Sequence, residues 1–452
     1  MAGVTRAREA AFKILLAVER GKANADELLR GRAVSALEQP DRNLATALVL
    51  GVLRWQILLD QQFKQLLSRP GAKLDAEVLI ALRMGAFQLK HLDRIPAHAA
   101  IGESVELAKR AGHRFGAGMV NAVLRKLGTA CSRLLDEEPG REAEQAHPAW
   151  LVERWNRFYG EEATRAICRR GQEQPLLAVR LANAEVEREL IAEGINLASG
   201  RLLAAARIVT AGDVMETEAF RSGRVRIQDE GSQLIAEIAA GSTGSVQKVK
   251  SIIDTCAAPG GKTMILAERN PEAQIVACEW SEQRLASLRE RVAAFGDRIE
   301  CRLADASALN ETASYDLALA DVPCSGTGTL GRNPEIRHRL RIEDLARHAE
   351  RQKAILRAVA RAIRPGGAIV YSTCSLEPEE NEEVVEAALA EMSGFRRVRV
   401  GGRIDALRDA GIVAEEGAER LRDCITAEGA LRLIPGALGT DGFFVAEIQQ
   451  AD

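Results

Sequence analysis

The chain contains 452 residues, of which 46% are apolar and 28% charged, and its formal net charge is −3. This length predicts two to four domains of about 100–200 residues, and the composition is that of a globular protein and excludes a disordered one. No run of about 18 apolar residues and no signal-peptide pattern occurs, so we expect a cytoplasmic protein without a membrane-spanning segment.

The eight cysteines and six histidines show no pattern typical of a metal site or a redox pair. No two cysteines are spaced as C-x-x-C, and the histidines do not cluster. In a large cytosolic chain most cysteines are free and fill small spaces in an apolar core. The sequence therefore predicts no bound metal, and it predicts that most cysteines are free and structural.

The N-terminal region, 1–135, has the pattern of helices. Apolar residues recur every three or four positions in stretches such as REAAFKILLAVERG and RNLATALVLGVLRWQILLDQQFKQLL. This region contains 21 Lys and Arg against 12 Asp and Glu, whereas the region 136–452 contains 40 against 52. We therefore predict an all-α domain at 1–140 whose positive charge binds RNA. A helical bundle with solvated basic faces has the same composition, and so has a domain that docks on a ribosomal or assembly protein.

An acidic, proline-containing stretch at 136–149, DEEPGREAEQAHPA, is a candidate linker. After it, WLVERWNRFYGEEATRAICRRG predicts a helix, and LLAVRLAN and RVRIQ predict strands. We therefore expect a small α+β subdomain at 141–235, followed by a third domain at 236–452.

From about residue 245 onwards, short apolar strands alternate with helices. The strands are KSIIDTC, AQIVACE, IECRLAD, YDLALAD and GAIVYST, and amphipathic segments such as SEQRLASLRERVAAF separate several of them. This βαβ alternation predicts a mostly parallel, Rossmann-like α/β sheet. Ligands of such sheets bind beyond the carboxyl ends of the strands, which is where the unusual polar residues of this chain fall.

The loop after the first strand, DTCAAPGGKT at 254–263, ends in the Gly-Lys-Thr of an ATPase phosphate loop. Cys256 stands where that loop needs its first glycine, and Pro259 removes a backbone N–H donor. Glu279 ends the second strand, and its place along the chain after Gly261 is typical of a carboxylate that binds ribose hydroxyls. The pattern favours a nucleoside site, although Asp321 could serve as the magnesium-binding acid of an ATPase.

Asp305 ends the third strand, where its carboxylate could accept a hydrogen bond from an adenine amino group. It could also cap the short helix that follows. Together with Gly260, Gly261 and Glu279, it describes a site for a nucleoside with a small, weakly charged tail, and S-adenosylmethionine fits that description. Lys262 begins the next helix, either as a solvated lysine or as a cofactor contact.

Two cysteines follow neighbouring strands, Cys324 in ADVPCSGTGTL and Cys374 in VYSTCSLEPEENE. Turn residues flank both, so a place at the mouth of the site fits them better than the core. A thiolate there suggests nucleophilic catalysis, because its addition to carbon 6 of cytosine makes carbon 5 a nucleophile towards a methyl donor. An acid near N3, such as Asp321, supports this addition, and a second thiol or a nearby group then assists release.

These stretches together resemble motifs I, IV and VI of the RNA (cytosine-5)-methyltransferases. The motifs are DTCAAPGGKT, ADVPCSGTGTLGRNPEI and VYSTCSLEPEENE. In addition, IPAHAAIGESVELAKRAG and GMVNAVLRKL are similar to the NusB-like domain at the N-terminus of the RsmB (Sun/Fmu) branch. HPAWLVERW, RIQDEGSQL and GTDGFFVAEI also resemble that branch. The resemblance covers nearly the whole chain, but the segment 401–430 matches nothing that we can place.

The resemblance implies a role for each matching residue. Cys374 is the expected nucleophile, Cys324 assists release of the product, and Asp321 contacts the cytosine near N3 as well as the cofactor. Glu279 is expected on the ribose and Asp305 near the adenine. The expected cofactor loop consists of Cys256, Ala257, Ala258, Pro259, Gly260, Gly261 and Lys262.

The resemblance also implies the reaction, which is methylation of carbon 5 of a cytidine in small-subunit (16S) ribosomal RNA by S-adenosylmethionine. Two other functions are compatible with parts of the sequence. One is a P-loop ATPase acting in ribosome assembly, and the other is an RNA-binding protein with a methyltransferase fold but no activity. The presence of both thiols and Asp321 disfavours the inactive protein.

Overall fold

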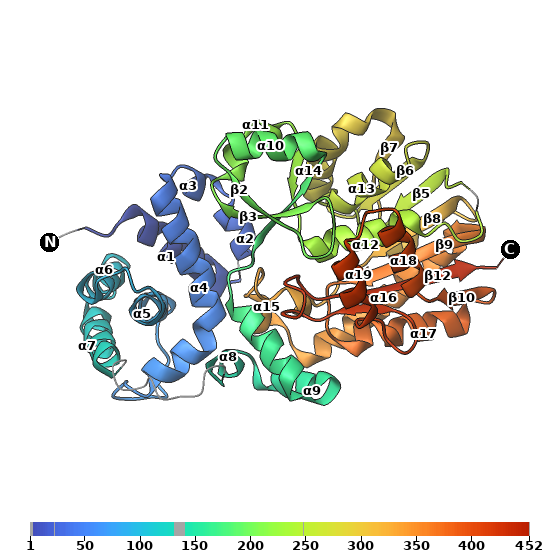
Figure 1. The fold of residues 1–452 in the computed structure, drawn as a ribbon. Helices are drawn as coiled ribbons and strands as arrows, with labels where there is room; N and C mark the ends of the chain where they lie inside the picture. Colours follow the sequence, from blue (N-terminus) through green and yellow to red (C-terminus); the bar gives the residue numbers. More distant parts are fainter. Residues whose placement is uncertain (1–2, 22, 131–140, 247, 452) are drawn as a thin grey trace. The chain divides into compact units, whose positions relative to one another are not determined.

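The computed structural model describes residues 3–21, 23–130, 141–246 and 248–451 (Figure 1). It divides into two compact units. The first, called here the helical unit, consists of residues 1–174 and 330–339, and the second, the sheet unit, consists of residues 175–329 and 340–452. Each unit is described by itself.

The described part of the helical unit contains helices and connecting turns, which confirms the predicted all-α N-terminal fold. The predicted linker at 136–149 falls partly outside the described residues, and its described part, from residue 141 onwards, contains the short helix α8 (Arg141–Gln145). The helices are α1 (Arg6–Glu19), α2 (Ala25–Leu29), α3 (Arg32–Ser35), α4 (Gln39–Lys64), α5 (Ala76–His91), α6 (Ala97–Arg110), α7 (Arg114–Ala130), α8 (Arg141–Gln145), α9 (Ala149–Gln172) and α15 (Ile336–Arg339).

Small residues let the helices of this unit approach closely. Gly51 of α4 faces the ring of Phe87 of α5, and a Cβ at position 51 would lie 2.0 Å from Cζ of that ring. Gly85 of α5 faces Leu124 of α7, where a Cβ would lie 2.3 Å from Cδ1. Both contacts belong to one buried apolar core, so these helical glycines are explained by packing and not by a need for flexibility.

Helix α4 is long and apolar enough to cross a membrane by length and composition alone, and it is the only described helix that is. Half of its most apolar stretch is buried within the structure. Leu48, Val52 and Leu59 of α4 are completely buried in the core of the helical unit. Core helices of globular proteins commonly meet the same length and composition criterion.

A segment from far along the sequence completes the helical unit. Residues 330–339 are separated from the rest of this unit by most of the sheet unit's chain, yet they pack against α4 and α9. Arg54 donates to the carbonyl of Gly331 at 2.7 Å, and Arg337 donates to the carbonyls of Arg54 and Gly171 at 2.9 and 3.0 Å. Burial lowers the pKa of Arg337 to about 9. Carbonyl acceptors thus hold two buried guanidinium groups in place.

The sheet unit begins with a small antiparallel sheet in the order β2-β3-β1-β4. Its strands are β1 (Leu177–Leu181), β2 (Asn196–Ser199), β3 (Ala206–Ala211) and β4 (Val225–Ile227), accompanied by α10 (Ala184–Ala192) and α11 (Glu218–Arg221). The α+β character predicted for this region is confirmed. The sequence pattern indicated β1 and β4 but missed β2, which is mostly exposed, and β3, which is mostly half-buried or exposed; neither has a strong apolar alternation.

The main sheet has the order β10-β12-β9-β8-β5-β6-β7, and β11 pairs with β12 (Figure 1). Strands β5 to β9 are parallel, as predicted, whereas β10, β11 and β12 form an antiparallel edge that was not predicted. The strands are β5 (Ser251–Asp254), β6 (Gln274–Glu279), β7 (Ile299–Leu303), β8 (Tyr315–Asp321), β9 (Ile363–Thr373), β10 (Phe395–Val398), β11 (Leu431–Leu433) and β12 (Phe443–Gln450).

Successive side chains of the parallel strands enter two different cores. Ile252 and Leu317 point into one apolar cluster, while their neighbours Ile253 and Ala318 point into another. Since strand side chains alternate between faces, this pattern requires helices on both sides of the sheet. The first cluster contains residues of α12 (Glu230–Gly241), α13 (Gly261–Arg269) and α14 (Glu282–Val292), and the second contains residues of α16 (Ile342–Ala362) and α17 (Glu382–Glu391).

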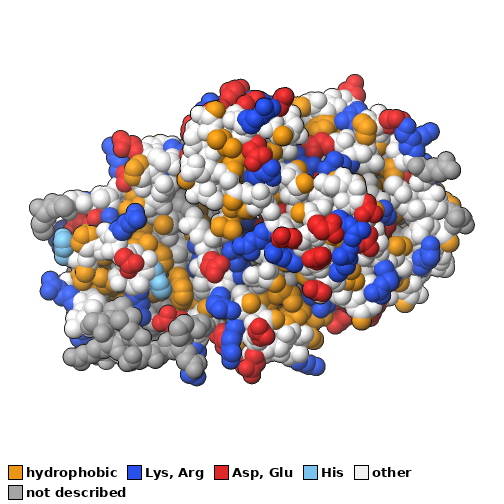
Figure 2. Space-filling model, in the orientation of Figure 1, with side chains coloured by type: hydrophobic (Ala, Val, Ile, Leu, Met, Phe, Trp, Pro, Cys, Tyr) orange, Lys and Arg blue, Asp and Glu red, His pale blue; other side chains and the backbone are white. Residues whose placement is uncertain are grey.

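The segment 401–430, which the sequence pattern did not explain, extends the first of these cores. It forms α18 (Gly401–Asp409) and α19 (Glu415–Arg422) before β11 begins. Ile404 and Leu421 are buried in the apolar cluster. Figure 2 shows positive and negative side chains interspersed over the outer face of α18 and α19, where Arg422 lies 2.7 Å from Asp405.

Candidate active site

The predicted site residues gather at one edge of the main sheet. Strands β5, β6, β7, β8 and β9 are parallel neighbours, so their carboxyl ends lie along the same edge. Glu279 and Asp321 are the last residues of β6 and β8, and Cys374 directly follows β9. The expectation that ligands bind beyond these strand ends therefore selects one contiguous region of the sheet unit.

The loop after β5 is shaped by glycine and closed by backbone hydrogen bonds. Gly260 has φ of 101°, a left-handed conformation that side chains rarely adopt, and it directly precedes α13. The N–H of Ala257 donates to the carbonyl of Cys278 at 2.8 Å, and the N–H of Gly260 donates to that of Ala257 at 2.7 Å. Helix α13 begins at Gly261, so the prediction that Lys262 lies in the first turn of a helix is confirmed.

Glu279 is buried beside this loop, with 2% of its surface exposed. Its carboxylate accepts a hydrogen bond from the N–H of Ser281 at 2.9 Å and lies 3.4 Å from the guanidinium of Arg284. Arg284 also donates to the carbonyl of Ala258 at 2.7 Å, which ties the carboxylate to the loop. An acid held in this way is suited to accept hydrogen bonds from ribose hydroxyls.

A small cavity of about 20 Å³ lies next to Glu279. The exposed indole of Trp280 forms one wall, and the guanidinium of Arg351 stacks on it at 4.8 Å from the ring centroid. The cavity is lined by Thr255, Cys256, Glu279, Trp280, Arg284, Ala304, Ala306, Pro323, Arg351 and Ile355. Cys256 therefore lines this cavity, and its role in cofactor binding stays a prediction; the Arg351–Trp280 pair was not predicted.

Asp305 lies between two residues that line this cavity, Ala304 and Ala306. Its Oδ1 accepts hydrogen bonds from the N–H of Ser307 at 3.0 Å and from the Ser307 hydroxyl at 2.8 Å. These two bonds lower the pKa of the Asp305 carboxyl. The structure thus shows the capping role that the sequence left open, and a role on adenine stays a prediction.

Lys262 and Asp321 form an ion pair across the mouth of the site. The Nζ atom of Lys262 lies 2.7 Å from Oδ2 of Asp321, and the hydroxyl of Ser372 donates to Oδ1 at 2.7 Å. Burial disfavours the charged lysine, but the neighbouring Asp321 outweighs it and raises the pKa of Lys262. Lys262 is therefore not a solvated first-turn lysine, and Ser372 is a site residue that the sequence analysis missed.

The two cysteines at the strand ends touch each other. Cys324 Sγ and Cys374 Sγ lie 3.4 Å apart, and both thiols are free. The hydrogen bond with Cys374, burial and nearby negative charge raise the pKa of Cys324 well above its ordinary value. The neighbouring strand ends therefore bring together the two thiols that the sequence analysis selected.

Asp254, at the end of β5, is a further acid that the sequence analysis did not select. It is buried, and its Oδ2 accepts a hydrogen bond from the hydroxyl of Thr263 at 2.7 Å. Burial raises its pKa to about 7. An acid that titrates near neutral pH at the base of the cofactor loop is a strongly perturbed group of the kind found at functional sites.

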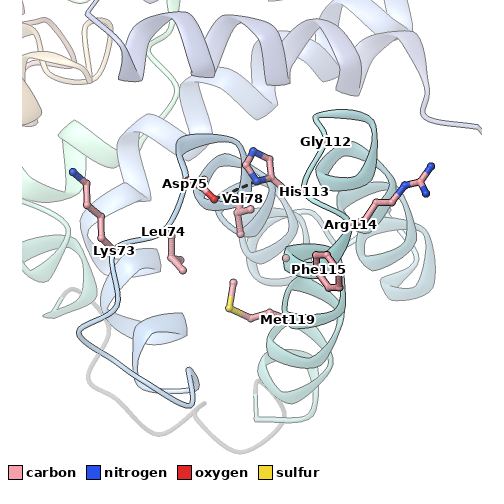
Figure 3. A pocket seen from close by; sticks show the side chains of 10 residues that line it. Lys73, Leu74, Asp75, Val78, Gly112, His113, Arg114, Phe115 and Met119 are labelled. Atoms are coloured by element: carbon pink, nitrogen blue, oxygen red, sulfur yellow. Dashed lines mark ion pairs between the residues drawn. The ribbon is translucent and has the colours of Figure 1, made fainter.

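The helical unit contains a separate cavity of about 320 Å³ (Figure 3). Its wall includes His113, whose Nδ1 lies 3.2 Å from Asp75, and Phe115, whose side chain is fully exposed. None of the residues predicted for catalysis or cofactor binding lines it. Among the described residues, no group of three or more His, Cys, Asp or Glu side chains is arranged to hold a metal ion.

Three family profiles match the chain. The profile described as 16S rRNA methyltransferase RsmB/F matches residues 245–449, and the NusB family matches residues 5–129. A ferredoxin-like domain of RsmF/B-like methyltransferases matches residues 147–209. These matches agree with the resemblance that the sequence motifs indicated.

Curated relatives match over nearly the full length. The chain is 34% identical to ribosomal RNA small subunit methyltransferase B of Pseudomonas syringae pv. tomato, with 98% of this chain and 96% of that one covered. It is 32% identical to the protein of the same name from Xanthomonas campestris pv. campestris, with 100% and 98% covered.

Solved structures share the fold. The crystal structure of PH0851 superposes with a TM-score of 0.78 at 23% identity and covers 99% of this chain and 100% of that one. A methyltransferase homolog from Pyrococcus horikoshii gives a TM-score of 0.52 at 23% identity, with 67% and 95% covered. The predicted combination of an N-terminal helical domain and an α/β methyltransferase domain is thereby confirmed.

Proposed function

We propose that this chain, which belongs to the RsmB/F family of small-subunit ribosomal RNA methyltransferases, methylates carbon 5 of a cytidine through a covalent cysteine adduct. The observation that carries the proposal is the pair of thiols, Cys324 and Cys374, in contact at 3.4 Å at the ends of adjacent strands. The half-buried Lys262–Asp321 ion pair lies at the same edge of the sheet. A thiol nucleophile is needed for carbon 5 of cytosine, because that carbon is a poor nucleophile by itself.

The residues at the cofactor loop fit S-adenosylmethionine. Glu279 offers a buried carboxylate beside a cavity, and Trp280 offers an aromatic wall. We assign the ribose hydroxyls to Glu279 and the adenosyl group to the loop from Cys256 to Lys262, with Asp305 near the adenine. The bound cofactor supplies an electrophilic methyl group on a sulfonium centre.

The protein's own residues then act on the cytosine. The Cys374 thiolate forms a bond to carbon 6, and the displaced electron pair moves to the N3 side of the ring, where a proton is taken up. Asp321 stabilises that proton, and carbon 5 becomes nucleophilic. After carbon 5 has been methylated, loss of its proton restores the double bond and expels the Cys374 thiolate from carbon 6. Cys324, in contact with Cys374, assists this last step.

Isotope transfer tests the reaction. Methyl-labelled S-adenosylmethionine and unmethylated 16S ribosomal RNA are incubated with the wild type, Cys374→Ala and Cys324→Ala, and the RNA is digested to nucleosides. We expect 5-methylcytidine with the wild type, none with Cys374→Ala, and a trapped protein–RNA adduct with Cys324→Ala. Label in any other nucleoside would contradict the proposed target, and label with Cys374→Ala would contradict the proposed nucleophile.

The three domains of the chain have different proposed roles in this function. We infer domains at 1–140, 141–235 and 236–452, with the NusB-like domain holding ribosomal RNA phosphates and the last domain carrying the chemistry. The positive charge of the region 1–135 supports this division. We also infer a cytoplasmic location, where the ribosomal RNA substrate is present. Docking on a ribosomal or assembly protein is the alternative, and a pull-down with and without RNase separates the two.

A further inference from the structure

A buried cluster of hydroxyl and carboxylate groups connects the residues that follow the two thiols. Ser325 follows Cys324, Ser375 follows Cys374, and the two serine Oγ atoms lie 3.0 Å apart. Oε2 of Glu380 accepts a hydrogen bond from each hydroxyl. The two loops that carry the thiols are thus joined through one carboxylate, although 50 residues of sequence separate them.

The second oxygen of Glu380 extends the connection to a helix. Its Oε1 accepts hydrogen bonds from the N–H of Ser325 at 2.8 Å and from the side-chain amide of Gln352, in α16, at 3.1 Å. The same amide donates to the carbonyl of Pro323, the residue before Cys324, at 2.9 Å. The backbone on both sides of Cys324 is therefore bound to Glu380 or to its partner Gln352.

Glu380 is completely buried, and Ser375 and Gln352 are at most 1% exposed. Within the described residues, Glu380 forms no ion pair, so neutral donors alone compensate for the burial of its carboxylate. Burial of an acid costs free energy unless hydrogen bonds replace the lost water, and four donors do so here. A residue that only closed a turn would not need a carboxylate that binds the Cys324 loop, the Cys374 loop and α16 together.

We propose that Glu380 is a positioning residue of the active site, whose carboxylate holds the Cys324 and Cys374 loops together so that the two thiols stay in contact. The catalytic role of Glu380 rests on the proposed function. The claim that Glu380 keeps the two thiols in contact does not depend on that function. Glu380 does not touch the reacting atoms, so it acts through the cysteines. Its charge has a second effect, because it helps to keep Cys324 in the thiol form by raising its pKa, together with the hydrogen bond from Cys374 and burial.

The test compares Glu380→Gln with Glu382→Gln in the full-length chain. Glu382 lies two residues further on, is also largely buried, and pairs with Arg432 away from the serines. Alkylation by iodoacetamide is followed at Cys324 as a function of pH, by peptide mass spectrometry, in a Cys374→Ser background. We expect Glu380→Gln to lower the apparent pKa of Cys324 and Glu382→Gln to leave it unchanged. Equal titration curves for the three proteins would overturn the inference.

Methylation kinetics supply the second measurement, with Cys374 present. We expect Glu380→Gln to lower kcat about 10- to 100-fold while KM for S-adenosylmethionine stays constant, because the thiols and not the cofactor loop are displaced. Glu380→Asp keeps the charge but is too short to reach both loops, so it should lower kcat without lowering the Cys324 pKa. An unchanged kcat in both Glu380 variants would refute the positioning role.

Two further variants keep the inference testable if Glu380→Gln does not fold. Ser325→Ala and Ser375→Ala each remove one donor and leave the carboxylate in place. Each is expected to lower kcat, and the double variant should lose less than the product of the single losses because both act through Glu380. If the loss of kcat in the double variant equalled the product of the two single losses, the serines would act independently and the shared role through Glu380 would be contradicted. Failure of the proposed function is distinguishable, because it would remove 5-methylcytidine formation by the wild type and leave the Cys324 titration intact.

Discussion

Lys262 Nζ lies 2.7 Å from Asp321 Oδ2, so an ion pair joins the first turn of α13 to the end of β8. The lysine side chain is 15% exposed and the carboxylate 25%. The pair therefore holds the cofactor loop against the strand that carries the acid expected near N3 of the cytosine. Because Ser372 also donates to Asp321, the carboxylate has a defined orientation before any substrate binds.

Replacement of Lys262 by Met should impair both function and stability. We expect kcat/KM for methyl transfer to fall by about 100-fold, because a misoriented catalytic acid commonly costs that much. The raised pKa of Lys262 means that its contribution to stability is complete below 10.5, the ordinary lysine value, and is lost only as the pH rises through the higher folded value. The difference in melting temperature between wild type and variant, measured from pH 7 to 11, should therefore shrink only above about pH 10.5. Lys250→Met, on an exposed lysine, is the control and should show no such change.

Asp254 predicts a loss of stability with rising pH as well, but in a much lower pH range than Lys262. Its pKa is raised from 3.8 to about 7, so the folded state binds a proton more tightly than the unfolded chain does. The protein should therefore lose stability as the pH rises from about 4 to about 7, by up to a few kcal/mol, since one pKa unit corresponds to about 1.4 kcal/mol. Asp254→Asn should remove this loss while keeping an acceptor for the Thr263 hydroxyl. Chemical denaturation of the wild type and Asp254→Asn at pH 5 and pH 8 measures the free energy of unfolding. An equal change between the two pH values in both proteins would show that Asp254 is not the group responsible.

Gly260→Ala should weaken the cofactor loop. Its φ of +101° disfavours a side chain, and an added Cβ would lie 2.8 Å from Cδ1 of Leu288. We expect a loss of about 1–3 kcal/mol in the free energy of unfolding and weaker S-adenosylmethionine binding by calorimetry. Gly102→Ala, in the open middle of α6, is the matched control and should be neutral or stabilising. Unchanged affinity of Gly260→Ala for S-adenosylmethionine would show that this loop is not part of the cofactor-binding site.

Charge reversal on α7 tests the RNA-binding role of the helical unit. Arg125 and Lys126 are exposed, so the double change Arg125→Glu and Lys126→Glu should leave the fold intact. We expect weaker binding to 16S ribosomal RNA and a smaller slope of log affinity against log salt, by about 1 for each phosphate that is no longer neutralised. The exchange Arg125→Lys with Lys126→Arg keeps the charge and should keep the slope. An unaltered slope after reversal would place the RNA-binding surface elsewhere.

The parallel part of the sheet was predictable because β5, β6, β8 and β9 contain buried apolar runs that end in a polar residue, and helical patterns separate several of the strands. Asp321 and Cys374 stood out for the same reason, since turn residues follow them where the chain leaves the core. Strands β10 and β12 were not identified because an antiparallel edge gives no βαβ alternation, and GTDGFFVAEI was noticed only through its resemblance.

Interactions between residues far apart in the sequence set the limit of what could be predicted for the site. Lys262 could be solvated or bound, because its partner Asp321 lies 59 residues away. Glu380 lies in the acidic stretch EPEENE, which has the pattern of a solvated helix start, and only the fold shows that it is buried beneath two serines. Asp305 kept two alternatives at the sequence level, since a strand-end acid that binds a ligand and a helix cap have the same sequence pattern, and the structure shows the cap.

The helical unit cannot be completed before the ribosome has synthesised the segment 330–339. Residues 1–174 leave the ribosome well before β8 and the segment after it exist, yet Arg54 takes its acceptor from Gly331 and Arg337 fills the space beside Gly171. Part of the interior of the nascent helical unit therefore stays open until much of the parallel sheet has been translated. Final closure of the N-terminal unit therefore waits until β5 to β8 have been translated, and a ribosome stalled before residue 330 should hold a helical domain more sensitive to protease than the finished one.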